Sequence, residues 1–275
     1  MCARYSAAKD LAEFAKFFNF VCRVAFFTPR YNIAPRQQAP VIVLDHFQPT
    51  VKLMRWGLIP SWAPDESIGD KLINARAETI FEKPSFRKPM ERQRCLIPAD
   101  GFYEWQMSGR SVFASLRRDE ESKVEGQELK IGFDTLPSPS SRSRRGSEPA
   151  TFTPFRFTMR DNSFFCFAGI YEKWIRPPKS GEFDFADLDE PPPSRVVETF
   201  SIITTTANAM VAAIHDRMPV IVHPDHWLWW IDERRDGEAV KSLLRPYPAE
   251  DMDCYRVSKL VNNARNDSPD CIKPA

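Results

Sequence analysis

Cys2 directly follows the first methionine of the chain. Removal of Met1 would give this residue both a free α-amine and a thiol. The α-amine has an ordinary pKa of about 8, so part of it is neutral at physiological pH, and a nearby cation lowers the pKa of a thiol. Such an aminothiol attacks an aldehyde through its amine and then closes a ring through its sulfur. Many chains carry a second-position cysteine with no role, so Cys2 needs support from other residues.

An amide, a guanidinium and a carboxylate follow one another in the segment NARAET, Asn74–Thr79. If the segment is extended, Asn74 and Arg76 project from the same side of the chain. Arg76 is then suited to hold a phosphate, and Asn74 to orient or hydrogen-bond a reacting carbonyl. The alternative is a salt-bridged helix start at the surface, which these residues alone do not exclude.

A single carboxylate, Glu104, stands among aromatic residues in the segment GFYEW, Gly101–Trp105. Apolar surroundings raise the pKa of a carboxyl group and suit it to proton transfer near neutral pH. Phe102 and Trp105 offer ring faces on which unpaired bases stack. The alternative is an ordinary strand in which the aromatic residues alternate into the core and the glutamate is solvated.

His215 stands beside an acid and a base in the segment HDRMP and is a candidate general acid or base, although a lone histidine is more often structural. His215, His223 and His226 match no standard zinc spacing, and no cysteine lies near them in the sequence. The six cysteines form no CxxC pair, which argues against a zinc ribbon and a disulfide scaffold. We therefore expect no metal and no cofactor.

The composition favours one elaborated domain in a reducing compartment. The chain has 275 residues, of which 43% are hydrophobic and 12% aromatic, enough to bury a substantial core. Its formal charge is +1, so any contact with a nucleic acid must come from a local basic cleft. No apolar run approaches the ~20 residues that span a bilayer, and no secretion signal is recognisable.

The elements that must position these residues are mostly strands. Apolar and β-branched runs predict strands at Pro40–Leu44, Val51–Trp56, Arg94–Ile97, Glu198–Thr205 and Pro219–Val222. Phe155–Thr158 and Phe164–Ile170 are expected to form a hairpin that turns at Asp161–Asn162. Helices are expected at Ala7–Phe20, Ala75–Phe81 and Ala207–Ile214, and in HWLWWID, with Asp225 as its cap. The absence of repeats and of β-α alternation favours an α+β domain built on antiparallel sheet.

Several motifs, taken together in their order, resemble the SOS-response-associated peptidase (SRAP) family, and in particular its eukaryotic branch. They are MC-x-R-Y at Met1–Tyr5, YNIAP at Tyr31–Pro35, RWGLIPSW at Arg55–Trp62, NARAET, GFYEW, FAGIYEKW at Phe167–Trp174, TTTAN with HDRMPVI, and VNNARNDSPDCIKP at Val261–Pro274. Two segments fall outside the resemblance. Residues 108–154 are rich in charge, Ser and Pro and are expected to form a mobile insertion, and residues 177–194 a proline-rich loop.

The resemblance implies one α+β domain over residues 2–275, with a mainly antiparallel, barrel-like β core, flanking helices and a basic cleft for single-stranded DNA. The family's catalytic residues match Cys2, Asn74, Glu104 and His215. The expected DNA contacts are Arg4, Asn32, Trp56, Arg76, Trp105 and Arg217, with Trp62 as a further candidate for stacking on bases.

The activity that the resemblance implies is covalent capture of abasic sites. Met1 is removed, by the chain itself or by an aminopeptidase, and the Cys2 amine and thiol then form a thiazolidine with the sugar aldehyde. The resemblance also implies self-processing and abasic-site lyase activity, in a monomeric, intracellular and nuclear protein that binds single-stranded DNA and no membrane. Two alternatives stay open: a cysteine peptidase that acts in trans with His215 as base, and a non-catalytic single-strand-binding module.

Overall fold

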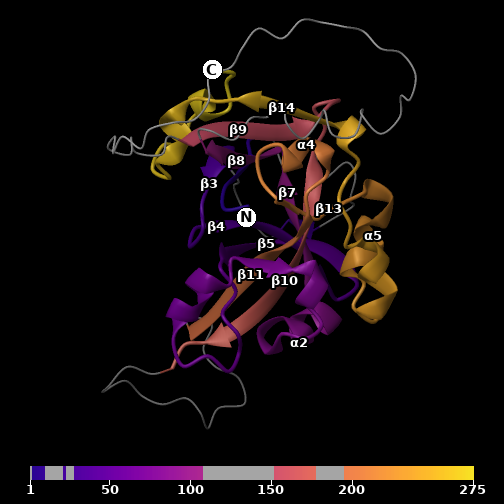
Figure 1. Cartoon of the computed structure of the whole chain (residues 1–275). Helices are drawn as coiled ribbons and strands as arrows, with labels where there is room; N and C mark the ends of the chain where they lie inside the picture. Colours follow the sequence, from indigo (N-terminus) through magenta and orange to yellow (C-terminus); the bar gives the residue numbers. More distant parts are fainter. Residues whose placement is uncertain (1, 10–20, 23–27, 108–151, 178–194) are drawn as a thin grey trace, which may run out of the picture.

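The computed structural model describes residues 2–9, 21–22, 28–107, 152–177 and 195–275 (Figure 1). One of its two sheets is wholly antiparallel and has the strand order β14-β9-β8-β1-β3. Its strands are β1 (Tyr5–Ala7), β3 (Arg30–Ile33), β8 (Gly101–Met107), β9 (Phe152–Met159) and β14 (Met252–Arg256). The short first strand is thus held on both sides, which fixes the start of the chain.

The second sheet closes on itself. Its strands β4 (Gln38–Asp45), β5 (Gln48–Trp56), β7 (Arg94–Ala99), β10 (Phe165–Ile175) and β11 (Val196–Thr206) pair antiparallel in the order β5-β4-β7-β10-β11. A parallel contact of β11 with β5 completes a five-stranded barrel. Short strands extend this sheet: β2 (Val21–Cys22), β6 (Asn74–Arg76), β12 (Arg217–Pro219) and β13 (Ile221–Val222). The expected barrel-like α+β fold is confirmed.

Two large apolar clusters fill the molecule. The first joins the barrel interior to the antiparallel sheet, with the rings of Tyr5 and Trp56 at 5.2 Å and those of Phe102 and Phe157 at 4.9 Å. Cys2 belongs to this cluster. The second cluster lies beneath the helices α2 (Pro84–Arg92) and α5 (Trp227–Ile231), which cover one side of the barrel (Figure 1). Burial on this scale supplies most of the driving force for folding.

The remaining helical elements are short. They are α4 (Ala209–Ala212), η1 (Glu66–Lys71), η2 (Ala77–Thr79), η4 (Pro224–His226), η5 (Glu238–Leu243), η6 (Ala249–Asp251), η7 (Lys259–Asn262) and η8 (Pro269–Cys271). Arg94 is buried and donates to five backbone carbonyls, among them those of Met90 and Trp230, and so holds the ends of α2 and α5 together.

Several strands predicted from the sequence are confirmed, with wider bounds, as β4, β5, β7 and β11. The predicted hairpin of Phe155–Thr158 with Phe164–Ile170 is wrong, because β9 pairs with β8 and β14 whereas β10 pairs with β7, β11 and β13. The chain does turn near Asn162, which has a φ of 56°, but the two strands part into different sheets. Pattern alone does not distinguish a hairpin from a crossing between sheets.

The predicted helices are shorter than expected. Extended strand β6 and the single turn η2 replace the helix predicted from Ala75 to Phe81, and α4 is one turn. Asp225 caps no helix through its side chain: His223 accepts the backbone N–H of Asp225 instead. Ala7 ends a strand, and most of the helix expected from it lies outside the described residues.

Most of the two expected loop segments also lies outside the described residues. Of residues 108–154, only 152–154 are described, and they begin strand β9. Of residues 177–194, only Pro177 is described. Within the described part of the chain, no helix is long and apolar enough to cross a bilayer.

Candidate active site

Cys2 stands three residues before β1 and is fully buried against the first apolar cluster. Its Sγ lies 3.8 Å from the backbone carbonyl oxygen of Arg4. Burial raises the pKa of the thiol far above its ordinary value, and the nearby negative charge of Glu104 adds to this. The sulfur is therefore a neutral thiol at neutral pH, and Glu104 lies within electrostatic reach of it.

Asn74 fixes the backbone of Cys2. Its Nδ2 donates to the carbonyl oxygen of Cys2 at 2.8 Å. The side chain is placed by strand β6, which pairs in parallel with β11 at Ile202. The Oδ1 of Asn74 is also buried and has no hydrogen-bond partner among the described residues. This amide oxygen is a candidate acceptor for an amine or a hydroxyl group of a substrate.

Glu104 lies in β8, where pairing with β9 and the aromatic residues around it leave the side chain only 3% exposed. Burial raises the pKa of its carboxyl group to about 7, and the negative charge of Asp216 contributes. At neutral pH the protonated and ionised forms are therefore both populated. A carboxyl group in this state can take up a proton and return it within one reaction.

His215 follows α4, and its Nδ1 has two neighbours. Asp216 places a carboxylate oxygen 2.9 Å from it, and the backbone N–H of Arg217 donates to it at 3.0 Å. The first contact suits a protonated Nδ1 and the second a bare one, so the two favour different protonation states of the ring. Asp216 also raises the pKa of Glu104, which places this segment near the acid.

Arg76 lies on β6 and Arg217 on β12, two short strands that both pair with β11, and both arginines act on Glu78. Arg217 binds both carboxylate oxygens of Glu78, at 2.6 and 2.9 Å, and the carbonyl oxygen of Thr204 at 2.7 Å. These hydrogen bonds lower the pKa of Glu78, and the charge of Arg76 contributes. The Arg76 side chain is exposed and donates no hydrogen bond to another described residue. Of this pair, Arg76 is the cation that is open to a phosphate.

Arg4 is held from the other side of the site. Its Nη1 donates to the Oδ1 of Asn32 at 2.8 Å and to the carbonyl oxygen of Val261 at 2.7 Å. The guanidinium also lies 5.8 Å from the ring centre of Trp105, whose Nε1 donates to Asn262. Arg4 and Trp105 therefore form one half-buried unit with the C-terminal segment.

Two of the expected DNA contacts lie in the interior. Trp56 is fully buried and its Nε1 donates to the carbonyl oxygen of Ile73 at 2.8 Å, so it offers no ring face to a base. Asn32 is also fully buried, and its amide donates to the carbonyl oxygens of Val261, Asn263 and Asn266. The burial of Trp56 and Asn32 disagrees with the expectation that these two residues contact DNA. Trp62, in contrast, is 59% exposed.

The C-terminal segment 258–275 contacts the site, although none of its residues is among those predicted from the sequence. Asp267 accepts the backbone N–H groups of Tyr31 and Asn32 and pairs with Arg30, and the segment covers Arg4 and Trp105. The run of Asn and Asp in NNARND was its only local signal, because such residues often bond backbone groups. In the described ranges, no three His, Cys, Asp or Glu side chains are placed to hold a metal ion.

Comparison with known proteins finds a matching family model and several similar relatives. The family model "SOS response associated peptidase (SRAP)" matches residues 1–124 and 143–264. "Abasic site processing protein YoqW" of Bacillus subtilis (strain 168) is 36% identical over 276 residues, covering 99% of both chains. "Abasic site processing protein HMCES" of Gallus gallus is 31% identical and covers 90% of this chain and 67% of its own length.

Solved structures show the same fold. A protein from Bacteroides thetaiotaomicron superposes with a TM-score of 0.72 at 26% identity, over the whole of both chains. One from Bordetella bronchiseptica has a TM-score of 0.63 at 20% identity, covering 94% of this chain and all of its own, a likeness of fold alone. The family model spans most of the sequence, including the segments that carry Cys2, Asn74, Glu104 and His215. The chain belongs to the SOS response associated peptidase (SRAP) family.

Proposed function

We propose that this chain captures abasic sites in single-stranded DNA as a covalent adduct of Cys2. The observation that carries the proposal is the pairing of Cys2 with two groups that serve such chemistry. Asn74 fixes its carbonyl, and Glu104, with a pKa of about 7, lies within electrostatic reach. Relatives over nearly the full chain bear the name abasic site processing protein, which supports the same activity.

The reaction begins when Met1 has been removed. The free amine of Cys2 attacks the aldehyde carbon of the ring-opened sugar and forms a carbinolamine, and loss of water then gives an imine. Glu104 in its ionised form accepts a proton from the attacking amine. In its protonated form it gives that proton to the alkoxide oxygen, and it then relays the second amine proton to the resulting hydroxyl group, which leaves as water, so the carboxylate is regenerated.

Ring closure adds the thiol across the imine. The Sγ of Cys2 bonds to the former aldehyde carbon, and the thiol proton passes to the imine nitrogen, so the step needs no outside reagent. The raised pKa of the buried thiol keeps the sulfur protonated until the imine nitrogen accepts the proton. The hydrogen bond from Asn74 holds the Cys2 backbone while the five-membered thiazolidine closes.

The flanking DNA is held by nearby cations and rings. Arg76 is the exposed cation beside the site, and Arg4 and Arg217 add positive charge on either side. Trp105 and the exposed Trp62 provide faces on which unpaired bases stack. His215 moves protons as the imine forms and reverses, and the carboxylate of Asp216 at its Nδ1 stabilises the protonated ring.

Self-processing and lyase activity belong to the same proposal. Removal of Met1, by the chain itself or by an aminopeptidase, exposes the amine, and reversal of the imine after strand cleavage would release a lyase product. Mass spectrometry of the N-terminus of wild-type and Glu104→Gln protein, made in cells and in a purified translation system, separates the two routes. We expect the protein to act as a monomer, in the nucleus of a eukaryotic cell.

The central step is tested with an abasic single-stranded oligonucleotide on denaturing gels. Wild-type protein is expected to give a stable covalent band without a reductant. Cys2→Ala and Cys2→Ser keep an α-amine but no thiol, so they are expected to give a band only when borohydride reduces the imine. An undiminished band from Cys2→Ala without reductant would exclude the thiazolidine.

The alternatives predict other outcomes. A peptidase that acts in trans would cleave a peptide without DNA and would lose that activity in Cys2→Ala. A non-catalytic single-strand binder would have equal affinity for intact and abasic DNA and would form no covalent species.

A further inference from the structure

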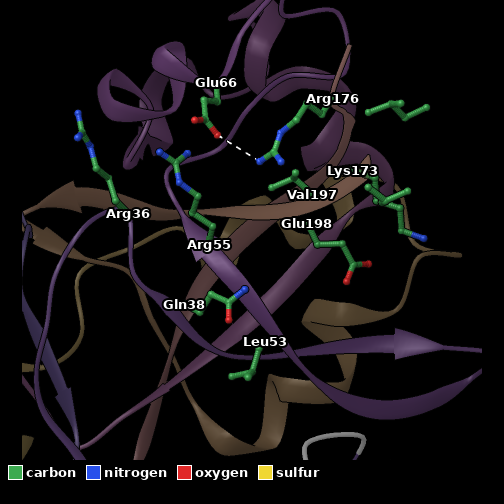
Figure 2. Close-up of a pocket in the computed structure, with 11 residues that line it drawn as sticks. Arg36, Gln38, Leu53, Arg55, Glu66, Lys173, Arg176, Val197 and Glu198 are labelled. Atoms are coloured by element: carbon green, nitrogen blue, oxygen red, sulfur yellow. Dashed lines mark ion pairs between the residues drawn. The ribbon is translucent and has the colours of Figure 1, made fainter. Parts of the chain in front are cut away.

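A groove on the outer side of the barrel lies where β5 and β11 pair in parallel (Figure 2). It has a volume of about 970 Å³. Four cations and two carboxylates are among the residues that line it: Arg36, Arg55, Lys173, Arg176, Glu66 and Glu198. The lining is therefore net positive, although the formal charge of the whole chain is only +1. This is the kind of local field that attracts an anionic ligand.

The arginines of the groove are already oriented. Arg36 binds both carboxylate oxygens of Asp70, and Arg55 lies 3.5 Å from the same carboxylate. Arg176 faces Glu66 at 3.7 Å, as Figure 2 shows. Exposed pairs of this kind contribute little to stability. Their effect is to hold the guanidinium groups at the groove, where Arg36 stays 68% exposed.

Arg55 has donor capacity to spare. Its Nη1 is buried and has no hydrogen-bond partner among the described residues, and its Nη2 reaches Asp70 only at 3.5 Å. The missing side chain of Gly69 makes room for this guanidinium, since a Cβ there would lie 2.9 Å from Nη1. A buried N–H without a partner is costly, so a small shift of the guanidinium toward a ligand oxygen would be favourable.

The groove is not purely polar. Leu53 and Ile175 are 41% and 50% exposed along it, and Val196 and Val197 are partly exposed. A lone phosphate ion would leave these apolar side chains without a contact. A nucleic-acid strand presents anionic oxygens together with apolar sugar and base faces, and therefore matches both parts of the lining.

The groove is connected to the candidate active site through two elements. Helix η1 supplies Glu66 to the groove and carries Asp70, which contacts two of the groove's arginines; the chain then continues to Asn74, which bonds to Cys2. Strand β11 carries both Glu198 in the groove and Ile202, the partner of Asn74. Four residues of strand cover about 13 Å. At the duplex rise of ~3.4 Å per nucleotide, this distance corresponds to at most about four nucleotides of a single strand.

We infer that this groove binds the phosphodiester backbone of the DNA strand on one side of the abasic site. The inference rests on the proposed function, because it takes the strand held at Cys2 and extends it along β11. The phosphates contact four cations of the groove: Arg36, Arg55, Lys173 and Arg176. The sugars or bases contact the apolar side chains of Leu53 and Ile175. Only one flank of the abasic site, either the 5′ or the 3′ flank, enters the groove, since the groove lies toward one end of β11.

The test compares noncovalent affinities for single-stranded oligonucleotides that carry a tetrahydrofuran analogue of the abasic site. The first oligonucleotide has short flanks. The second is extended on the 5′ side and the third on the 3′ side, each by more than about four nucleotides, so that the added strand reaches the groove. Wild-type protein is expected to bind one of the extended strands roughly tenfold more tightly, with a steeper salt dependence. In Lys173→Gln/Arg176→Gln the gain is expected to vanish, and the salt slope to fall by about 1.4, or about 0.7 for each phosphate contact.

Arg87→Gln/Lys241→Gln is the matched control, because it removes two exposed cations that pair with other carboxylates, on α2 and η5. It is expected to keep the gain. The inference would be overturned if the longer flank increased affinity equally in both double variants, or if neither variant showed the increase. Displacement of the long strand by polyglutamate at the same phosphate-equivalent concentration would also overturn it, because the groove would then be a site for acidic peptides.

Covalent capture of a short, natural abasic oligonucleotide separates the two proposals. Lys173→Gln/Arg176→Gln is expected to form the adduct at the wild-type rate, since neither residue belongs to the candidate active site. Failure of wild-type protein to form any adduct would contradict the proposed function alone, because the dependence of affinity on flank length is measured without chemistry.

Discussion

At the scale of single residues, the environment of Glu104 has the largest consequence. Its carboxyl group is 3% exposed and has a pKa of about 7 instead of the usual 4.5. Between these values the folded state binds more protons than the unfolded state, so stability falls as pH rises from about 4.5 to about 7. The whole shift corresponds to a cost in stability of about 3 kcal/mol, which is fully present above pH 7 and absent below pH 4.5. The candidate acid-base group is thus retained at a cost in stability.

The substitution Glu104→Gln tests whether the raised pKa of Glu104 costs stability. The variant is expected to be more stable than wild type at pH 8, by up to about 3 kcal/mol, and the difference is expected to shrink toward pH 5. Its rate of adduct formation at neutral pH is expected to fall by about 10²-fold or more. Urea unfolding at both pH values and single-turnover capture measure the two effects. A stability difference that does not depend on pH would contradict the raised pKa.

At the scale of elements, strand β1 must be held firmly because it places Cys2. A buried network fixes it to β8 and β9: Asp100 accepts the hydroxyl of Ser6 at 2.6 Å and the N–H of Ala8 at 3.1 Å, and pairs with Arg156 at 3.0 Å. Gly101 makes room for Arg156, since a Cβ there would lie 2.5 Å from its Nε. The ion pair between Asp100 and Arg156 is therefore a candidate anchor of the active site.

Asp100→Ala is expected to destabilise the protein by about 3 to 5 kcal/mol, because it leaves the buried Arg156 without its carboxylate. Asp100→Ala/Arg156→Met removes both charges and is expected to recover part of that loss. Denaturant unfolding checks both, with Asp270→Ala as a control at an exposed pair, where a change within about 0.5 kcal/mol is expected. A double variant less stable than Asp100→Ala would contradict the account.

The C-terminal segment is the second element that supports the site. Asn32→Ala removes three hydrogen bonds to this segment and one from Arg4, and is expected to cost about 3 kcal/mol and to weaken DNA binding through Arg4. Asn263→Ala, at an exposed side chain of the same segment, is expected to change neither. Unfolding curves and binding to abasic-analogue DNA measure both. Normal stability in Asn32→Ala would show that the segment is held by other contacts.

At the scale of the whole molecule, the balance of charge decides how DNA is attracted. The chain has 38 basic and 37 acidic residues, so no global field draws DNA to it. Attraction must come from the cations gathered at the site. Three arginines in contact with phosphates would give a slope of log affinity against log salt of about −2.

Arg76→Ala is expected to reduce the magnitude of that slope by about 0.7, since the proposed function gives this exposed cation one phosphate contact. Adduct already formed is expected to persist at high salt. Titrations at several salt concentrations check the first statement, and denaturing gels after a salt wash check the second. Arg87→Ala, on α2 outside the candidate DNA-binding surface, serves as control and is expected to keep the slope. An unchanged slope in Arg76→Ala would remove it from the interface.

The sequence by itself determined the chemical groups and much of the local structure. The order of motifs around Cys2, Asn74, Glu104 and His215 indicated the family, and apolar patterns indicated strands β4, β5, β7 and β11. These features depend on residue type and on near neighbours, which the sequence shows directly.

Only the tertiary structure decided burial and long-range pairing. It separated β9 from β10, placed Trp56 and Asn32 inside, left Trp62 exposed, and brought the C-terminal segment onto Arg4. It also buried Glu104, whose pKa of about 7 follows from that burial. The physical reason is that exposure and electrostatic environment depend on contacts between residues far apart in the chain, whereas a local pattern is the same in a core and at a surface.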